Sequence, residues 1–81
     1  MDDLPFKAHR YYQRVGRRKH PEVKAEWILR ALVARTHRQV QEDGRIRYWF
    51  FVAEAGKYLR VVLEPDDATV LNAFLDRDFI P

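Results

Sequence analysis

Five residues of this 81-residue chain could carry out acid–base chemistry on a phosphate group. His9 and His20 are the candidates for the acid and the base, because histidine titrates close to neutral pH. Arg47 and Arg60 could stabilise the charge that builds on phosphate oxygens, and Tyr58 could donate a hydrogen bond to them. These are the parts needed for metal-independent RNA cleavage, in which a base deprotonates the 2′-hydroxyl and an acid protonates the leaving 5′-oxygen.

Each of these residue types also has a purely structural interpretation. A histidine that precedes a proline, as His20 does, is most often a solvated loop residue. Arg47 and Arg60, which fall on predicted strands, could instead form ion pairs with Glu54, Glu64 or an acid near the end of the chain. His37 falls on a predicted polar strand and has no obvious chemical partner. The catalytic and the structural interpretations both remain open from the sequence.

Several other kinds of site lack the residues that they need. The chain has no cysteine and no serine, so it offers neither a thiolate nor a serine nucleophile. Its three histidines have no His-x-x-x-His spacing, and its three glycines form no phosphate-binding loop. We therefore expect no metal ion and no cofactor.

Positive charge is concentrated near the beginning of the chain. Residues 1–47 carry twelve Lys and Arg against six Asp and Glu, whereas residues 48–81 carry three against six. A one-signed segment attracts polyanions such as nucleic acids, although the alternative is a solvated helix face. Between Leu4 and Pro21 there is no Asp or Glu, and the candidate nucleic-acid-binding residues of this stretch are Arg10, Arg14, Arg17, Arg18 and Lys19.

The stretch 45–63 predicts a β-hairpin that would carry the arginines. Two runs rich in β-branched and aromatic residues flank a short break that contains Gly56. Strict alternation makes one face of this hairpin apolar and gives the other face arginines beside Trp49 and Phe51. We take the apolar face as the core. The mixed face could stack nucleobases, form a second core, or contact another copy of the chain.

A helix over residues 22–34 is expected to cover that core. Pro21 suits a first helical turn, and the apolar residues form a broad stripe on one side. Trp27 and Leu32 would be its anchors in the core.

A second helix is predicted over residues 4–15 from apolar positions that recur with a helical period. Asp2 or Asp3 could cap its start, and Gly16 suits the position just past its end. Residues 17–20 would then form a basic connector. The adjacent tyrosines at positions 11 and 12 leave an edge strand as the competing interpretation.

The remaining segments complete a sheet. Residues 36–41 predict a polar strand, joined to the hairpin by a turn at Asp43-Gly44. A turn cluster at 64–67 precedes a last strand over 69–75, and two apolar residues in the final segment 76–81 could tuck against a hydrophobic edge.

Together these elements predict an α+β fold in a single domain over residues 1–81. One or two N-terminal helices would pack on a three- to four-stranded antiparallel meander sheet. The sequence has no apolar run long enough to span a bilayer and no signal-peptide pattern, so a cytoplasmic protein without a membrane partner is expected.

Four segments of this pattern occur in a known group of proteins: Lys19-His20, the helix over 22–34, Asp43-Gly44-Arg45, and the strand over 57–62. The chain resembles the small toxin-type domains around BrnT and its uncharacterised relatives, in the wider RelE-like superfamily. The resemblance implies a toxin of a toxin–antitoxin pair, with ribonuclease activity held in check by an antitoxin protein. The early histidine of that family corresponds to either His9 or His20. The alternative function is a non-catalytic module that binds RNA or protein, or that forms a homodimer.

Overall fold

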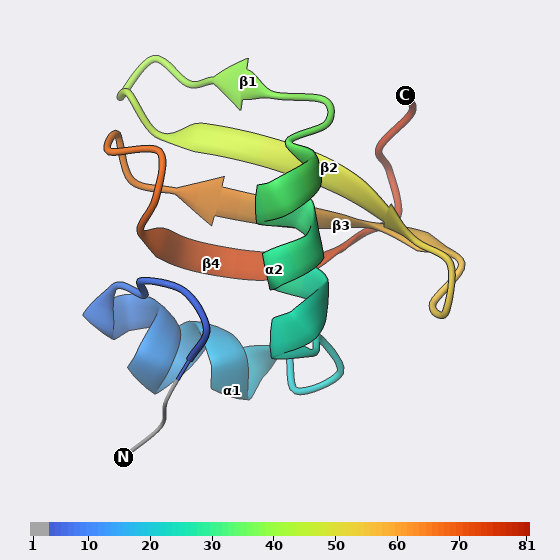
Figure 1. Ribbon diagram of the computed structural model, residues 1–81, viewed down its shortest axis with the longest axis horizontal. Helices are drawn as coiled ribbons and strands as arrows, with labels where there is room; N and C mark the ends of the chain where they lie inside the picture. The colour runs from blue at the N-terminus through green and yellow to red at the C-terminus, as the bar shows by residue number, and fades with distance from the viewer. Residues whose placement is uncertain (1–3) are drawn as a thin grey trace.

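In the computed structural model, which describes residues 4–81, the chain forms a four-stranded antiparallel sheet preceded in the sequence by helices (Figure 1). The elements are η1 (Tyr12–Gly16), α1 (Arg17–Lys19), α2 (Ala25–Ala34), β1 (Gln39–Val40), β2 (Ile46–Val52), β3 (Lys57–Leu63) and β4 (Val70–Asp76). The strands lie in the order β1-β2-β3-β4, each beside its sequence neighbour. The predicted α+β class and meander sheet are confirmed.

The central hairpin formed by β2 and β3 has the two faces that its alternation predicts. In its register Tyr48 lies opposite Val61 and Phe50 lies opposite Leu59, so these side chains share the core face. Tyr48, Leu59 and Val61 are completely buried. Gly44, in the turn before β2, has φ +90°, a left-handed value that favours glycine at this turn position.

Helix α2 covers the core face and crosses the strands (Figure 1). Ile28 and Ala31 are completely buried and Trp27 is nearly so, whereas the predicted anchor Leu32 is only partly buried. The helix begins at Ala25 rather than at residue 22. Val23 explains the delay, because it is buried in the core while its N–H donates to the His20 carbonyl in a turn that precedes the helix.

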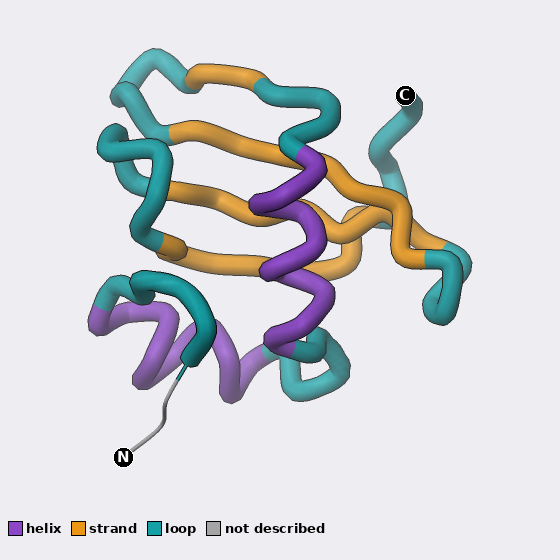
Figure 2. Tube along the Cα trace, in the orientation of Figure 1, coloured by secondary structure: helices purple, strands orange, loops and turns teal. Residues whose placement is uncertain are grey.

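The prediction of a helix over residues 4–15 was wrong at both ends. Helical backbone runs over residues 10–19 instead, with a π-helical middle, and it lies along the β4 edge of the sheet (Figure 2). Before it, the backbone pairs with that edge: His9 N donates to Val70 O (2.8 Å) and Val70 N donates to Lys7 O (2.8 Å). These long-range bonds hold residues 7–9 extended. The predicted capping residues Asp2 and Asp3 lie outside the described residues.

The predicted basic connector over 17–20 is therefore mostly helix α1, and Gly16 lies inside the helical segment rather than after it. The predicted strand over 36–41 is also shortened, to the two residues of β1. Arg35 and His37 both adopt positive φ, so the backbone there cannot join the sheet before Gln39.

Gly16 is required by a close approach to β4. A Cβ atom on Gly16 would lie 2.8 Å from Asn72 Oδ1 and 3.2 Å from Tyr12 Cδ1. A side chain at this position would therefore require Asn72 and Tyr12 to shift.

Replacing Gly16 by Ala tests this contact. We expect a loss of about 1 kcal/mol in the free energy of unfolding, because the clash outweighs the better helix propensity of alanine. In an Asn72→Ala background the same change should stabilise by about 0.5 kcal/mol, since the oxygen that it meets is gone. Urea denaturation of the four proteins gives the comparison, and an equal effect of Gly16→Ala in both backgrounds would contradict it.

Candidate nucleic-acid interface

The face of the sheet opposite α2 carries three of the five predicted catalytic residues, and we call it the open face. The register assigns it the side chains Arg47, Trp49, Phe51, Tyr58, Arg60, Val62, Asn72, Phe74 and Asp76. Arg60 lies directly opposite Trp49, and Arg47 lies directly opposite Val62. The structure thus places both predicted arginines on one face, as diagonal neighbours on adjacent strands.

Arg60 is held in a fixed position by aromatic rings and a carboxylate. Its guanidinium carbon lies 5.5 Å from the centre of the Trp49 ring and 5.2 Å from that of Phe74, distances typical of cation–π contacts. Its Nη1 lies 3.8 Å from Asp76 Oδ2, which also accepts a hydrogen bond from Trp49 Nε1 (2.9 Å). Burial, and then the charge of Arg47, lower the pKa of Arg60 below its ordinary value. The ion pair that the sequence left open for Arg60 is therefore made with Asp76.

Arg47, unlike Arg60, forms no ion pair with a carboxylate of the described chain. Among residues 4–81, its buried Nε also has no hydrogen-bond partner. A partly buried arginine whose Nε donor is unused is electrostatically suited to an anion. Arg45, by contrast, lies close to Glu64 (3.4 Å) and Asp43 (3.6 Å) at the turn end of the same strand.

A cavity of about 490 Å³ brings residues from four segments together. Its lining consists of His9, Tyr11, Gln41, Arg45, Arg60, Val62, Leu71 and Asn72. Two arginines supply positive charge, and a histidine and two side-chain amides supply further hydrogen-bonding groups. A second hollow of about 480 Å³ adjoins it through Gln41 and reaches Arg47. We call these two hollows, which share Gln41 as a lining residue, the recess of the open face; three arginines line it, and Glu42 and Asp43 also line its second hollow.

The two predicted catalytic histidines lie at opposite ends of the helical segment. A helix of this length spans roughly 15 Å, so one phosphate cannot contact both rings. His9 lines the cavity beside Arg60, and its Nδ1 accepts a hydrogen bond from Tyr11 N (2.9 Å). His20 packs on the Phe74 ring (5.6 Å between centroids), with its Nδ1 3.7 Å from Glu22 Oε2.

Tyr58 belongs to an aromatic cluster rather than to the cavity lining. Its ring packs edge-on against Phe51 (5.3 Å), Phe79 (5.0 Å) and His37 (5.9 Å). Phe79 also stacks on Trp49, so the final segment does tuck against an apolar surface, as the sequence predicted, whereas Ile80 is 87% exposed.

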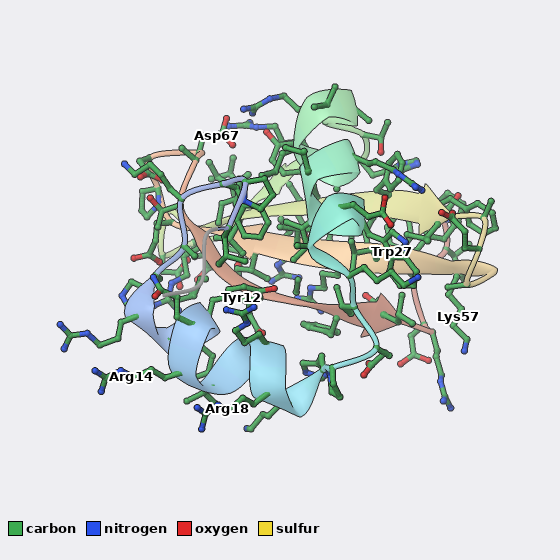
Figure 3. The ribbon with its side chains drawn as sticks, turned by 60° about the horizontal axis from the view of Figure 1, so that its bottom comes forward. Tyr12, Arg14, Arg18, Trp27, Lys57 and Asp67 are labelled. Atoms are coloured by element: carbon green, nitrogen blue, oxygen red, sulfur yellow. The ribbon has the colours of Figure 1, made fainter. Side chains whose placement is uncertain are left out.

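The predicted basic segment forms an outward-facing surface on the helix beside the open face. Arg10, Arg14, Arg18 and Lys19 are exposed, and we call these four residues the basic stripe; Arg17 is partly buried. Figure 3 shows Arg14 and Arg18 extending away from the body of the molecule, with Tyr12 on the inner side. In the part of the chain that the structure describes, no carboxylate lies within 4.0 Å of a charged nitrogen of the stripe. This charge is therefore available to a partner.

Sequence reasoning missed Arg45 and Asn72 as members of the cavity. Arg45 could have been found, because the Asp-Gly turn fixes the start of β2 and hence the face of every residue near it. Asn72 could not, since a register shift beside Leu63 decides how the first residues of β4 lie against β3.

Nothing in the comparisons identifies the chain further. Within residues 4–81, no helix is long and apolar enough to cross a membrane, and no three His, Asp or Glu side chains are grouped to hold a metal ion. Searches with this chain found no matching family model, no matching curated protein and no matching solved structure.

Proposed function

We propose that this protein binds single-stranded RNA through the basic stripe and the recess of the open face. The observation that carries the proposal is the stripe, four exposed cations with no carboxylate in the described chain to neutralise them. Cations of this kind bind phosphates chiefly by releasing the counterions of the nucleic acid.

The geometry of the stripe suits a phosphate backbone. Arg10, Arg14 and Arg18 are spaced four residues apart and exposed, so they lie on successive turns along the outer side of the helical segment. A strand that follows them reaches the cavity at its His9 end, where Arg45 and Arg60, each beside a carboxylate, present guanidinium hydrogen-bond donors.

The recess supports a single strand rather than a duplex. The volume of its first hollow, about 490 Å³, falls in the usual range for small-molecule sites and could accommodate one unpaired nucleotide. The amides of Gln41 and Asn72 can hydrogen-bond to the Watson–Crick edges of bases, which are accessible only where bases are unpaired.

A fluorescence-anisotropy titration with a labelled single-stranded RNA decamer tests this function. We expect binding that weakens steeply with salt, with a slope of log K against log[salt] of about −3 for four to five phosphate contacts. A duplex of the same length serves as the control and should bind more weakly. Failure to bind the decamer at low salt would overturn the proposal.

A toxin-like ribonuclease is the second candidate, and the shared position of His9 and Arg60 at one cavity favours it. His9 would take the proton of the 2′-hydroxyl, whose oxygen would attack phosphorus while the bond to the 5′-oxygen breaks. Arg45 and Arg60 would stabilise the phosphate charge, and Tyr11 would be the candidate acid at the leaving oxygen. The products would be a 2′,3′-cyclic phosphate and a free 5′-hydroxyl.

Analysis of the RNA recovered from the same titration distinguishes binding alone from cleavage. Products ending in a cyclic phosphate, lost in His9→Ala and in a 2′-deoxy substrate, would support the ribonuclease, and an intact decamer would leave a binding module. In a toxin–antitoxin pair, the antitoxin would present acidic residues to the basic stripe and compete with RNA for it.

A further inference from the structure

The flat ring of Phe79 lies on the open face in a stacked arrangement. Its centroid is 4.6 Å from that of Trp49 and the two planes differ by 9°. Trp49 is only 7% exposed. The indole therefore presents a stacking surface that this chain covers with one of its own side chains.

Phe79 is held over Trp49 mainly by contacts between aromatic rings. Residues 77–78 form a turn after β4, in which Asp78 N donates to Asp76 Oδ1 (3.1 Å). Phe79 touches Tyr58 (5.0 Å) and His37 (5.3 Å) edge-on, and the next residue, Ile80, is 87% exposed. Such a segment can move aside without breaking the pairing of β4 with β3.

The surroundings of Trp49 suit a nucleotide. Asp76 fixes the indole by accepting the hydrogen bond from its Nε1 (2.9 Å), so the ring keeps its orientation when the cover moves. Arg60 lies 5.5 Å from the ring centre and also lines the cavity. Arg47, two residues before Trp49 and on the same face, has an unpaired buried Nε. A base on the indole would therefore have cations within reach of its phosphates.

We propose that Trp49 is a nucleobase-stacking site and that Phe79 occupies it in the free protein as a substitute for the base. A purine base offers a larger flat π-surface than a phenyl ring, and its stacking on an aromatic side chain is correspondingly the stronger interaction. This inference rests on the proposed RNA binding and adds to it where an unpaired base is held.

The test removes the cover and follows Trp49 directly. In a Trp27→Phe background, the fluorescence comes from Trp49, the other tryptophan of the chain. We expect Phe79→Ala to bind an adenosine decamer about tenfold more tightly than the protein with Phe79, with quenching of Trp49 on binding. Phe79→Leu, which keeps bulk but lacks the ring, should behave in the same way if Phe79→Ala does not fold.

Two controls separate the base from the phosphate and from general loosening of the segment. Ile80→Ala should leave the affinity unchanged, because that side chain is already exposed. An abasic ribose-phosphate decamer should bind equally with and without Phe79, because it has no base to stack.

The outcomes distinguish failure of this site from failure of the proposed function. If RNA binds but neither Phe79 variant changes affinity or Trp49 quenching, the stacking site is wrong and RNA binding stands. If Phe79→Ala instead dimerises in sedimentation runs and binds RNA no more tightly, the surface belongs to a second copy. If no variant binds RNA, both proposals fall.

Discussion

Replacing Arg10, Arg14 and Arg18 together by glutamine should weaken RNA binding about 100-fold at about 0.1 M salt. Each lost phosphate contact removes about 0.7 from the magnitude of the salt slope, so the slope should flatten by about 2. Phosphate contacts that together contribute about 2 to the slope raise the affinity about 100-fold at this salt concentration. The three side chains are exposed, so the fold should be unaffected.

The matched control neutralises Lys24, Arg30 and Lys57 instead. Both triple variants reduce the net charge of the chain from +3 to 0, and the control also removes the ion pairs of Arg30 with Glu54 and Glu26. Lys24 and Arg30 are on or next to α2, on the opposite side of the sheet from the open face, and Figure 3 shows Lys57 far from Arg14 and Arg18. We expect the control to lose less than about threefold in affinity. Equal losses in the two variants would mean that binding reflects net charge and not the basic stripe.

Ile28→Ala is expected to lower the free energy of unfolding by about 3 kcal/mol. Ile28 is completely buried where α2 packs on the sheet, and truncation removes apolar contacts and leaves a cavity. For a chain of 81 residues this is a large share of the total stability. Urea denaturation should show a lower midpoint with an unchanged slope.

Val33→Ala on the same helix is the control for this substitution. Val33 is 77% exposed, so its truncation should change stability by no more than about 0.5 kcal/mol. Alanine is also the better helix former, which favours the variant slightly. Comparable losses for the two changes would contradict the orientation of α2 on the sheet.

The sequence was informative about the fold where periodicity is dictated by one buried face. The hairpin was predictable in detail, because a one-residue slip would expose Tyr48 and Leu59 and bury arginines. Helix α2 was predictable in kind from its apolar stripe, but its start was not. The position of its first turn depends on Val23 reaching the core, which is a tertiary contact.

The N-terminal region was the least predictable part of the described chain. The extended backbone of residues 7–9 exists because it pairs with Val70, more than 60 positions away in the sequence. Gly16 resembled a helix terminator, but its function is to let Asn72 approach. Neither contact has a local signal, so propensity and spacing assigned these residues to other roles.

The candidate site, like the fold, was predictable from the sequence only in part. Alternation alone predicted that Arg47 and Arg60 share a face. It could not show that His9 rather than His20 lies at the cavity with Arg60, since that depends on the helical segment following the β4 edge. Nor could it show Phe79 stacked on Trp49, because that contact joins two segments that are distant in the sequence.

The salt dependence of RNA binding by the unmodified protein tests the central claim most directly. If the basic stripe and the arginine-lined recess hold a phosphate backbone, log K for the single-stranded decamer should fall linearly with log[salt], with a slope of about −3. A slope near zero, or no detectable complex at low salt, would contradict the assignment of this surface to RNA.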